Sequence, residues 1–441
     1  MRMPTLVLRN LRRRPLATGL TAFSVALGVA LFSAVGALRE ASERGFQRSA
    51  SICNLVVGAK GSPLQLVLSS LYHMGQSPGN VPYSLYQELE ETVGVEWAVP
   101  MAIGDTFRGH RIVGITGNFF EDVRLGRERL PLTFSEGEGF SYGRAELDSL
   151  RAALEEHEGH GEGCTHLEDM IRENPGLTVA VLGAEAARRT GLGVGDAVVP
   201  SHGLEDGAIH KHDEAACEIV GVLEATGTPI DRAIYVPLGT YYVIADHQPD
   251  ERTGEGGARD PRGVSGILVN ARAGFYKINI WRDLNDRLDA QAAQPPQEVA
   301  ALFELVGTAD RVMRVISLLV VVVALVGVMV AIYNTMGARR REFAVLRALG
   351  ARRRTVLGLV TAEAAGIAAI GGMLGLLLAG ALLSAASGRV QAETGVALEV
   401  APGVAELLLL AAVTLAGALA GLVPAWTAYR TEPARHLSSG L

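Results

Sequence analysis

A short basic segment between two uncharged runs constrains this chain more than any other feature. Residues 339–354 read RRREFAVLRALGARRR and contain seven arginines but only one acidic residue, Glu342. The preceding run, residues 315–338, has no charge, and the following run, residues 355–388, carries only Glu363. An apolar stretch of about 18 residues or more is long enough to cross a bilayer. The pattern therefore predicts two membrane spans joined by a basic helix.

Two further apolar runs, residues 16–38 and 407–429, raise the predicted number of spans to four. Basic residues cluster before the first span, between the second and third, and after the fourth, whereas the loop at residues 389–406 is acidic on balance. Because Lys and Arg collect on the cytoplasmic side of short loops, both termini are predicted in the cytoplasm and residues 39–314 outside it. The remaining predicted segments are the cytoplasmic N-terminal residues 1–15 and tail 430–441.

The first apolar run has a competing interpretation as a secretory signal peptide, since it also follows a basic start. The run at residues 16–38 is longer than the roughly 7–15 apolar residues of such a peptide. Its removal would also leave three spans and break the agreement between charge clusters and topology. An uncleaved first span is therefore favoured.

The long segment 39–314 has the composition of an external α+β domain. Its β-branched stretches are short and have Gly or Pro at their ends, which is typical of strands. Its three cysteines are too few for a disulfide framework, so the domain must be held by its own core. The expected strands are residues 96–100, 106–115, 178–182, 197–200, 217–223, 234–236 and 266–269, and the expected helices are residues 83–93, 183–191 and a stalk at 299–314 that follows a linker at 291–297.

Three polar stretches, residues 136–174, 201–214 and 246–262, are predicted surface insertions, and the first two are rich in histidine. Imidazole and thiolate groups beside Asp and Glu suit zinc. The spacing fits no standard structural zinc site, however, and polar insertions often carry such residues without binding a metal. Zinc therefore remains an open alternative, with the candidate ligands His157, His160, Cys164, His166, His202, His210 and His212.

The motifs of common hydrolytic enzymes are missing from the chain. No G-x-x-x-x-G-K-[ST] phosphate loop occurs, and GAKGS at residues 58–62 has the wrong spacing. HExxH and GxSxG are missing too. The chain is therefore expected neither to be an enzyme nor to hydrolyse ATP itself.

Four stretches of sequence resemble one known family. They are REFAVLRALGARRRTVLGLVTAEA at 341–364, GLVPAWTAYRTEPARHL at 421–437, VLGAEAARRTGLGVGDAVV at 181–199 and IVGVLEATGTPIDRAIYVPL at 219–238. They are similar to the FtsX/MacB-like permease family of ABC transporters, whereas residues 136–174 and 246–262 have no counterpart there. The resemblance implies a multi-pass protein of the bacterial plasma (inner) membrane, with four transmembrane helices and a large α+β extracytoplasmic domain inserted between the first and second.

The resemblance also implies a function. The chain would be a permease subunit that dimerises and binds a separate cytoplasmic ATPase, which holds the ATP. Closure of the ATPase would move the external domain to transport or extrude a substrate, an action called mechanotransmission. A periplasmic partner protein is compatible with this scheme, and no nucleic-acid partner is expected.

On this interpretation residues 339–354 form the coupling helix that the ATPase binds. Positions 342/343, 346 and 349/350 form an apolar stripe on a helix, which positive-inside charge alone does not predict. The competing interpretation is that the arginines only fix topology and bind anionic lipid. The expected coupling residues are Arg341, Glu342, Arg347 and Arg352 for polar contacts, and Phe343, Leu346 and Leu349 for the apolar face.

Two GxxxG pairs predict close helix packing within the membrane without identifying the partner helices. They are Gly371 with Gly375 in the third span, and Gly417 with Gly421 in the fourth. Two other functions remain open. The first is a signalling regulator that activates a periplasmic partner such as a wall hydrolase, and the second is a membrane-anchored metalloenzyme.

Overall fold

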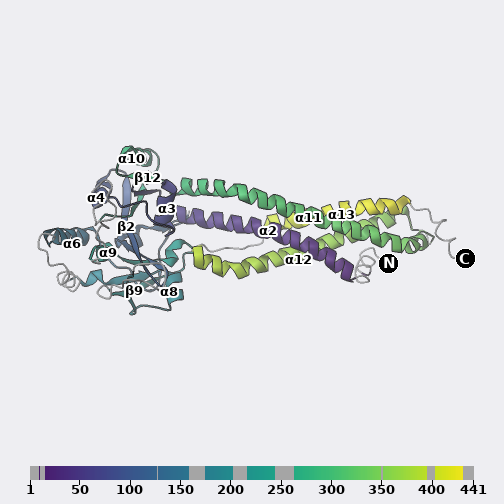
Figure 1. The fold of residues 1–441 in the computed structure, drawn as a ribbon, viewed down its shortest axis with the longest axis horizontal. Coiled ribbons are helices and arrows are strands. Elements are labelled where there is room, and N and C mark those ends of the chain that lie inside the picture. Colours follow the sequence, from purple (N-terminus) through teal and green to yellow (C-terminus); the bar gives the residue numbers. More distant parts are fainter. Residues whose placement is uncertain are drawn as a thin grey trace, which may run out of the picture. The chain divides into compact units, whose positions relative to one another are not determined.

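The computed structural model describes Arg9 and residues 15–126, 128–157, 174–201, 216–243, 263–348, 351–394 and 403–430. The chain forms two compact units (Figure 1). One, here called the membrane unit, comprises Met1–Ala41, Val306–Gly388 and Leu398–Leu441. The other, here called the α+β domain, comprises Ser42–Leu305 and Arg389–Ala397.

Within the described residues, four helices are long and apolar enough to cross a membrane, which confirms the predicted four spans. The first and second helices are longer than their spans and reach into the α+β domain, so the predicted stalk is part of the second helix. The second helix begins with two prolines, which are tolerated at a helix start because the first N–H groups have no helical partner. The helices are α2 (Pro15–Ala50), α11 (Pro295–Ala348), α12 (Arg353–Thr394) and α13 (Val404–Arg430).

A mixed sheet of ten strands forms the centre of the α+β domain. The strand order is β12-β1-β11-β2-β3-β10-β7-β9-β6, and β8 pairs with β9 beside this path. The pairs β10·β3 and β7·β9 are parallel, and the other pairs are antiparallel. The strands are β1 (Leu55–Gly58), β2 (Val95–Phe107), β3 (His110–Ile115), β6 (Phe134–Gly137), β7 (Val179–Leu182), β8 (Ala197–Val198), β9 (Cys217–Leu223), β10 (Ile234–Pro237), β11 (Gly266–Ala271) and β12 (Gln291–Ala293), with a separate pair β4 (Arg124–Leu125) and β5 (Leu130–Pro131).

Helices lie against this sheet. In α3, the Ser62 hydroxyl accepts a hydrogen bond from the N–H of Gln65, and Pro63 occupies the first turn, a typical helix start. Gly191 ends α8 in the left-handed conformation, as its sequence predicted. The helices are α3 (Pro63–Leu71), α4 (Tyr83–Glu91), α5 (Asn118–Asp122), α6 (Arg144–His157), α8 (Ala184–Thr190), α9 (Leu238–Val243) and α10 (Phe275–Asp286), with short 3-10 turns η1 (Pro175–Leu177) and η3 (Pro229–Arg232).

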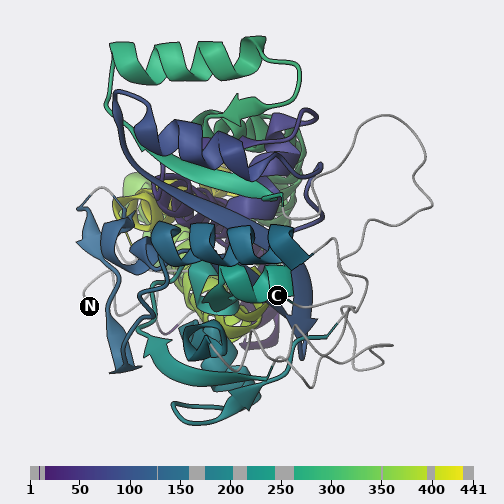
Figure 2. The ribbon, with the colours of Figure 1, turned by 90° about the vertical axis from the view of Figure 1, so that its left-hand side faces the viewer.

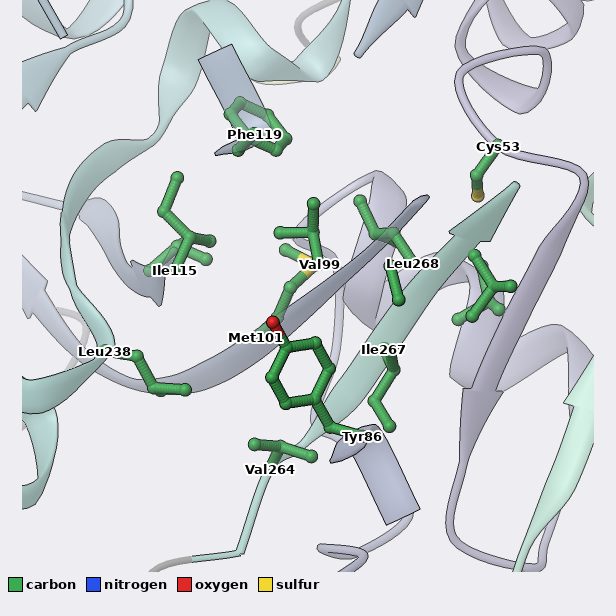
Figure 3. Packing of buried hydrophobic residues seen from close by; sticks show 14 of the residues in the cluster. Cys53, Tyr86, Val99, Met101, Ile115, Phe119, Leu238, Val264, Ile267 and Leu268 are labelled. Atoms are coloured by element: carbon green, nitrogen blue, oxygen red, sulfur yellow. The ribbon is translucent and has the colours of Figure 1, made fainter. Parts of the chain in front are cut away.

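Successive side chains of a strand point to opposite faces of the sheet, and a hydrophobic core lies on each face. In β10, Tyr235 belongs to the larger core, whereas Ile234 and Val236 belong to the smaller one. This follows from the period of two residues in a strand. Figure 3 shows the larger core, where side chains of the paired strands β2 and β11 lie near Tyr86 of α4.

Two sequence predictions in this domain are wrong in detail. Residues 106–115 do not form one strand, because Arg108 and Gly109 adopt positive φ angles of 47° and 79° and make a turn between β2 and β3. Residues 291–297 are not a simple linker either. Their first half is strand β12, which is too short to show a recognisable sequence pattern.

The prediction that residues 136–174 form a surface insertion is wrong for the first part of that stretch. The end of β6 and the helix α6 lie there. Leu147, Leu150 and Leu154 of α6 are buried, and their spacing of three and four residues places them on one helix face. Acidic residues on the other faces conceal this core contribution in the composition.

Candidate coupling site

The predicted coupling segment begins as a continuation of α11. This single helix has 54 residues and runs from Pro295 through the second span to Ala348. Arg341, Glu342, Phe343, Leu346 and Arg347 therefore lie in its last turns, whereas Leu349 is outside the described residues. Arg352 is exposed, directly before α12 begins.

The glycine pairs of the third and fourth spans face two different helices. A Cβ atom on Gly371 or Gly375 would lie 2.6 Å from the carbonyl oxygen of Ala22 or Ala26, respectively, in α2. A Cβ on Gly417 would lie 2.3 Å from the Cβ of Ala368 in α12. Such distances require glycine, because a side chain there would meet a neighbouring helix at less than contact distance.

The second glycine of the fourth span makes a similar approach to α12. A Cβ on Gly421 would lie 2.5 Å from the Cβ of Ala364. Ala364, Ala368, Gly371 and Gly375 follow one another at spacings of four, three and four residues, so they share one face of α12. This small-residue face contacts α13 in its first half and α2 in its second half.

The candidate metal ligands cannot be assembled into a site from the described residues. His157 ends α6, and its side chain is not among those described. Among the residues that the structure does describe, no group of three or more His, Cys, Asp or Glu side chains could hold a metal ion. The other candidates lie outside the described residues: His160, Cys164, His166, His202, His210 and His212.

The two helices that border the α+β domain are connected to neighbouring strands of its sheet. β1 follows α2 closely, and β12 immediately precedes α11. The two strands are antiparallel neighbours, with Val56 opposite Ala293 and Val57 opposite Ala292. Backbone hydrogen bonds therefore link the chain that leaves α2 with the chain that leads into α11.

Two asparagine side chains fasten these strands to their surroundings. The Nδ2 of Asn54 donates to the carbonyl oxygen of Ala271 in β11 (2.5 Å), and its Oδ1 accepts from the N–H of the same residue (2.9 Å). Asn285 of α10 pairs with both backbone groups of Ala292 in β12, at 3.0 and 3.4 Å. Each amide thus satisfies two backbone groups in the way that a neighbouring strand would.

Three aromatic residues, here called the aromatic clasp, join α2, α3 and α11. The ring of Phe46 stacks on Tyr72, with centroids 4.8 Å apart, and meets Phe303 edge-on at 5.5 Å. The Tyr72 hydroxyl donates to the carbonyl oxygen of Phe46 over 2.6 Å. Burial raises the pKa of Tyr72, so this hydroxyl remains a donor at neutral pH. Each such ring pair contributes about 0.5–1.5 kcal/mol beyond its buried area.

A buried carboxylate organises the loop before η3. Asp231 accepts hydrogen bonds from the N–H of Thr226 (2.9 and 3.1 Å), the hydroxyl of Thr226 (2.7 Å) and the N–H of Gly227 (2.8 Å). Burial raises the pKa of Asp231, while these donors act in the opposite direction. The turn η3 packs closely on Gly183, where an added Cβ would meet the carbonyl oxygen of Ile230.

His73 occupies a strained position after α3, with a φ angle of 53°. Its Nδ1 is buried and has no hydrogen-bond partner among the described residues. Burial, together with the positive charges of Arg111 and Arg232, lowers the pKa of His73 to about 3. The imidazole is therefore neutral at physiological pH.

No sequence pattern predicted the residues that join the helices to the sheet: Phe46, Asn54, Asn285 and Phe303. Their roles depend on contacts between residues far apart in the chain, which no local pattern reveals. Only Asn54 gives a weak local signal, because it directly precedes the apolar strand β1.

Known families match both parts of the chain. Residues 18–275 match the MacB-like periplasmic core domain, which is more than half of the chain, and residues 314–433 match the FtsX-like permease C-terminal region. Over 116 residues the chain is 35% identical to the macrolide export ATP-binding/permease protein MacB of Nitrobacter winogradskyi. That alignment covers 26% of this chain but only 17% of the relative.

Two solved structures are also similar to the chain. The periplasmic region of MacB from Actinobacillus actinomycetemcomitans gives a TM-score of 0.32 at 12% identity, covering 56% of this chain and 91% of that one. The extracellular domain of YknZ, a noncanonic ABC-type transporter from Gram-positive bacteria, gives 0.29 at 14% identity, covering 54% of this chain and 99% of that one.

Four membrane-length helices with an α+β domain between the first and second define a multi-pass membrane permease with an inserted external domain. The chain belongs to the FtsX/MacB-like permease family. This confirms the resemblance found in the sequence.

Proposed function

We propose that this chain is the membrane subunit of an ABC transporter whose ATPase is a separate cytoplasmic protein. ATP hydrolysis would move the α+β domain and thereby transport or extrude a substrate. Two copies of the chain would form the permease. Family membership supports this function. The structural observation on which it chiefly rests is that α11 is one continuous helix from Pro295 to Ala348.

In this mechanism α11 is the helix that connects the coupling segment with the α+β domain. Its 54 residues correspond to about 80 Å at 1.5 Å per residue. Residues 341–348, which include Arg341 and Arg347, lie at one end of this helix, and β12 precedes the other end. A displacement of the cytoplasmic end would be passed along this helix toward β12.

At the sheet the displacement would be shared with the first span. The β1–β12 ladder and the aromatic clasp connect the start of α11 to the end of α2. Asn54 then passes the movement to β11, the next strand of the sheet.

Charge reversal at the coupling segment tests this function. Arg347→Glu combined with Arg352→Glu should reduce co-purification of the ATPase at least tenfold, because polar contacts to the motor are replaced by repulsion. Arg389→Glu is the matched control, since it reverses an exposed arginine at the other end of α12. Normal insertion of all variants is checked by protease protection. An ATPase that remains bound to the double variant and hydrolyses ATP at the same rate contradicts the proposal.

Zinc binding by the histidine-rich stretches is a separate proposal, supported by their composition alone. Calorimetry on the full chain in nanodiscs should detect a zinc affinity that falls at least tenfold in a His210→Asn/His212→Asn variant. His247→Asn changes a histidine outside the candidate set and serves as the control. Equal zinc affinity in all three proteins contradicts a specific site.

A further inference from the structure

An apolar stripe on α10 faces away from the core of the α+β domain. Ile280 and Leu284 are buried and hold this helix in place, whereas Phe275, Ile278 and Trp281 are 74%, 50% and 38% exposed. The three exposed residues are spaced by three positions, so they follow one side of the helix. In both views α10 lies at the margin of the domain, next to β12 (Figures 1 and 2).

The stripe is large enough to form the apolar part of an interface. Leu288, just beyond the end of α10, is 95% exposed as well. With about 200 Å² for a fully exposed large side chain, the four residues expose roughly 500 Å² of mostly apolar surface. A stable interface buries about 800 Å² on each partner, of which about 56–65% is apolar. The exposed area therefore matches one side of such an interface.

We propose that this stripe binds the same stripe on a second copy of the chain, across a two-fold axis. The inference rests on the proposed function, in which two copies occupy one membrane in the same orientation. A two-fold axis that crosses α10 at the middle of the stripe would bring the two stripes face to face.

A two-fold axis perpendicular to α10 pairs the two α10 helices antiparallel, because it reverses every vector perpendicular to it. The stripe suits this pairing, since Phe275 and Trp281 are equally spaced on either side of Ile278. Ile278 then faces Ile278 of the second copy, and Phe275 faces Trp281 of the second copy. A surface that is complementary to itself is what a two-fold interface requires.

Contact at α10 would also be connected to the second span. The Nζ of Lys277 donates to Oε1 of Gln294, directly before α11, over 2.9 Å. Asn285 holds β12, and Arg287 forms an ion pair with Glu88 of α4 at 2.8 Å. Approach or separation of two copies at α10 would therefore be linked to movement of α11.

Cysteine cross-linking of the full chain in membranes tests this interface. Cys53 and Cys217 are buried and can stay, while Cys164→Ser removes the third native thiol. In that background Ile278→Cys should form a disulfide-linked homodimer in at least fivefold higher yield than Asp283→Cys, an exposed position on another face of α10. Adding Trp281→Asp should lower the Ile278→Cys yield severalfold, because it places a charge in the apolar contact.

The mass of the reconstituted protein in nanodiscs distinguishes failure of the α10 interface from failure of the proposed dimeric permease. A dimer in which Ile278→Cys and Asp283→Cys cross-link equally overturns the α10 interface alone. A disulfide to a different protein at Ile278→Cys overturns it as well, because another partner then covers the stripe. A monomer by mass overturns both the interface and the dimeric permease.

Discussion

Phe46 and Phe303 meet edge-on, with ring centroids 5.5 Å apart, and join the end of α2 to the start of α11. Both residues belong to the α+β domain, so this contact lies in the parts of the two helices that the domain includes. Tyr72 completes the clasp by stacking on Phe46. Within the α+β domain, the end of α2 and the start of α11 are thus joined by packed side chains as well as by the β1–β12 ladder.

Removing the Phe303 ring should loosen the edge of the sheet. Phe303→Ala deletes the edge-on contact and part of the domain core, at a local cost of about 1–2 kcal/mol. Hydrogen exchange of the β1 and β12 amides should therefore accelerate about tenfold. Leu305→Ala is the control, because Leu305 is 74% exposed in the same helix. Equal exchange rates in both variants would show that the clasp does not stabilise the junction.

A methyl group at the glycines of the third span should push α12 away from α2. Gly371→Ala or Gly375→Ala places a Cβ 2.6 Å from a carbonyl oxygen of α2, and overpacking of this kind costs about 1–3 kcal/mol. Each variant should unfold at a temperature several degrees lower in detergent. Gly380→Ala should be neutral or slightly stabilising, since no atom lies within 4 Å of its added Cβ. If all three variants melt together, the close contact with α2 is wrong.

Replacing the buried Asp231 carboxylate should destabilise the α+β domain. Asp231→Asn keeps the shape of the side chain but turns an NH₂ group toward N–H donors of Thr226 and Gly227. An unsatisfied buried donor costs about 1–3 kcal/mol, which should lower the urea midpoint. Asp289→Asn should cost less than about 1 kcal/mol, because that residue is half exposed in an ion pair with Arg287. Similar midpoints for both variants would argue against the loop as a structural anchor.

The low pKa of His73 makes the domain less stable in mild acid. The folded pKa of about 3 lies below the value of 6.5 expected for the unfolded chain, so between these values only the unfolded state binds the proton. Stability contributed by the neutral imidazole is complete above pH 6.5 and falls as pH drops. From pH 7 to pH 5 the loss should be about 2 kcal/mol.

The variant His73→Asn isolates this contribution from other titrations, and asparagine tolerates the positive φ angle better than most residues. Its free energy of unfolding should change between pH 7 and pH 5 by about 2 kcal/mol less than that of the wild type. Denaturant unfolding at both pH values provides the measurement. Parallel pH profiles for the two proteins would exclude His73 as the cause.

The sequence predicted most of the helices and strands but few of the contacts between them. The uncharged runs gave all four spans, and short β-branched stretches gave most strands of the sheet. The polar composition of residues 136–174 concealed α6, since three buried leucines were outnumbered by acidic residues. The strand β12 was missed because three residues carry too little pattern to predict.

Hydrophobic runs, charge clusters and helical or strand periodicity are local properties, and the sequence by itself determined them. They established four spans, an inserted α+β domain and a basic segment between the second and third spans. Only the tertiary structure decided that β1 and β12 are neighbours, that Phe46 meets Phe303, and that Gly371 and Gly375 face α2. The physical reason is that each of these contacts joins residues far apart in the chain, so their packing depends on the whole fold and leaves no local signal.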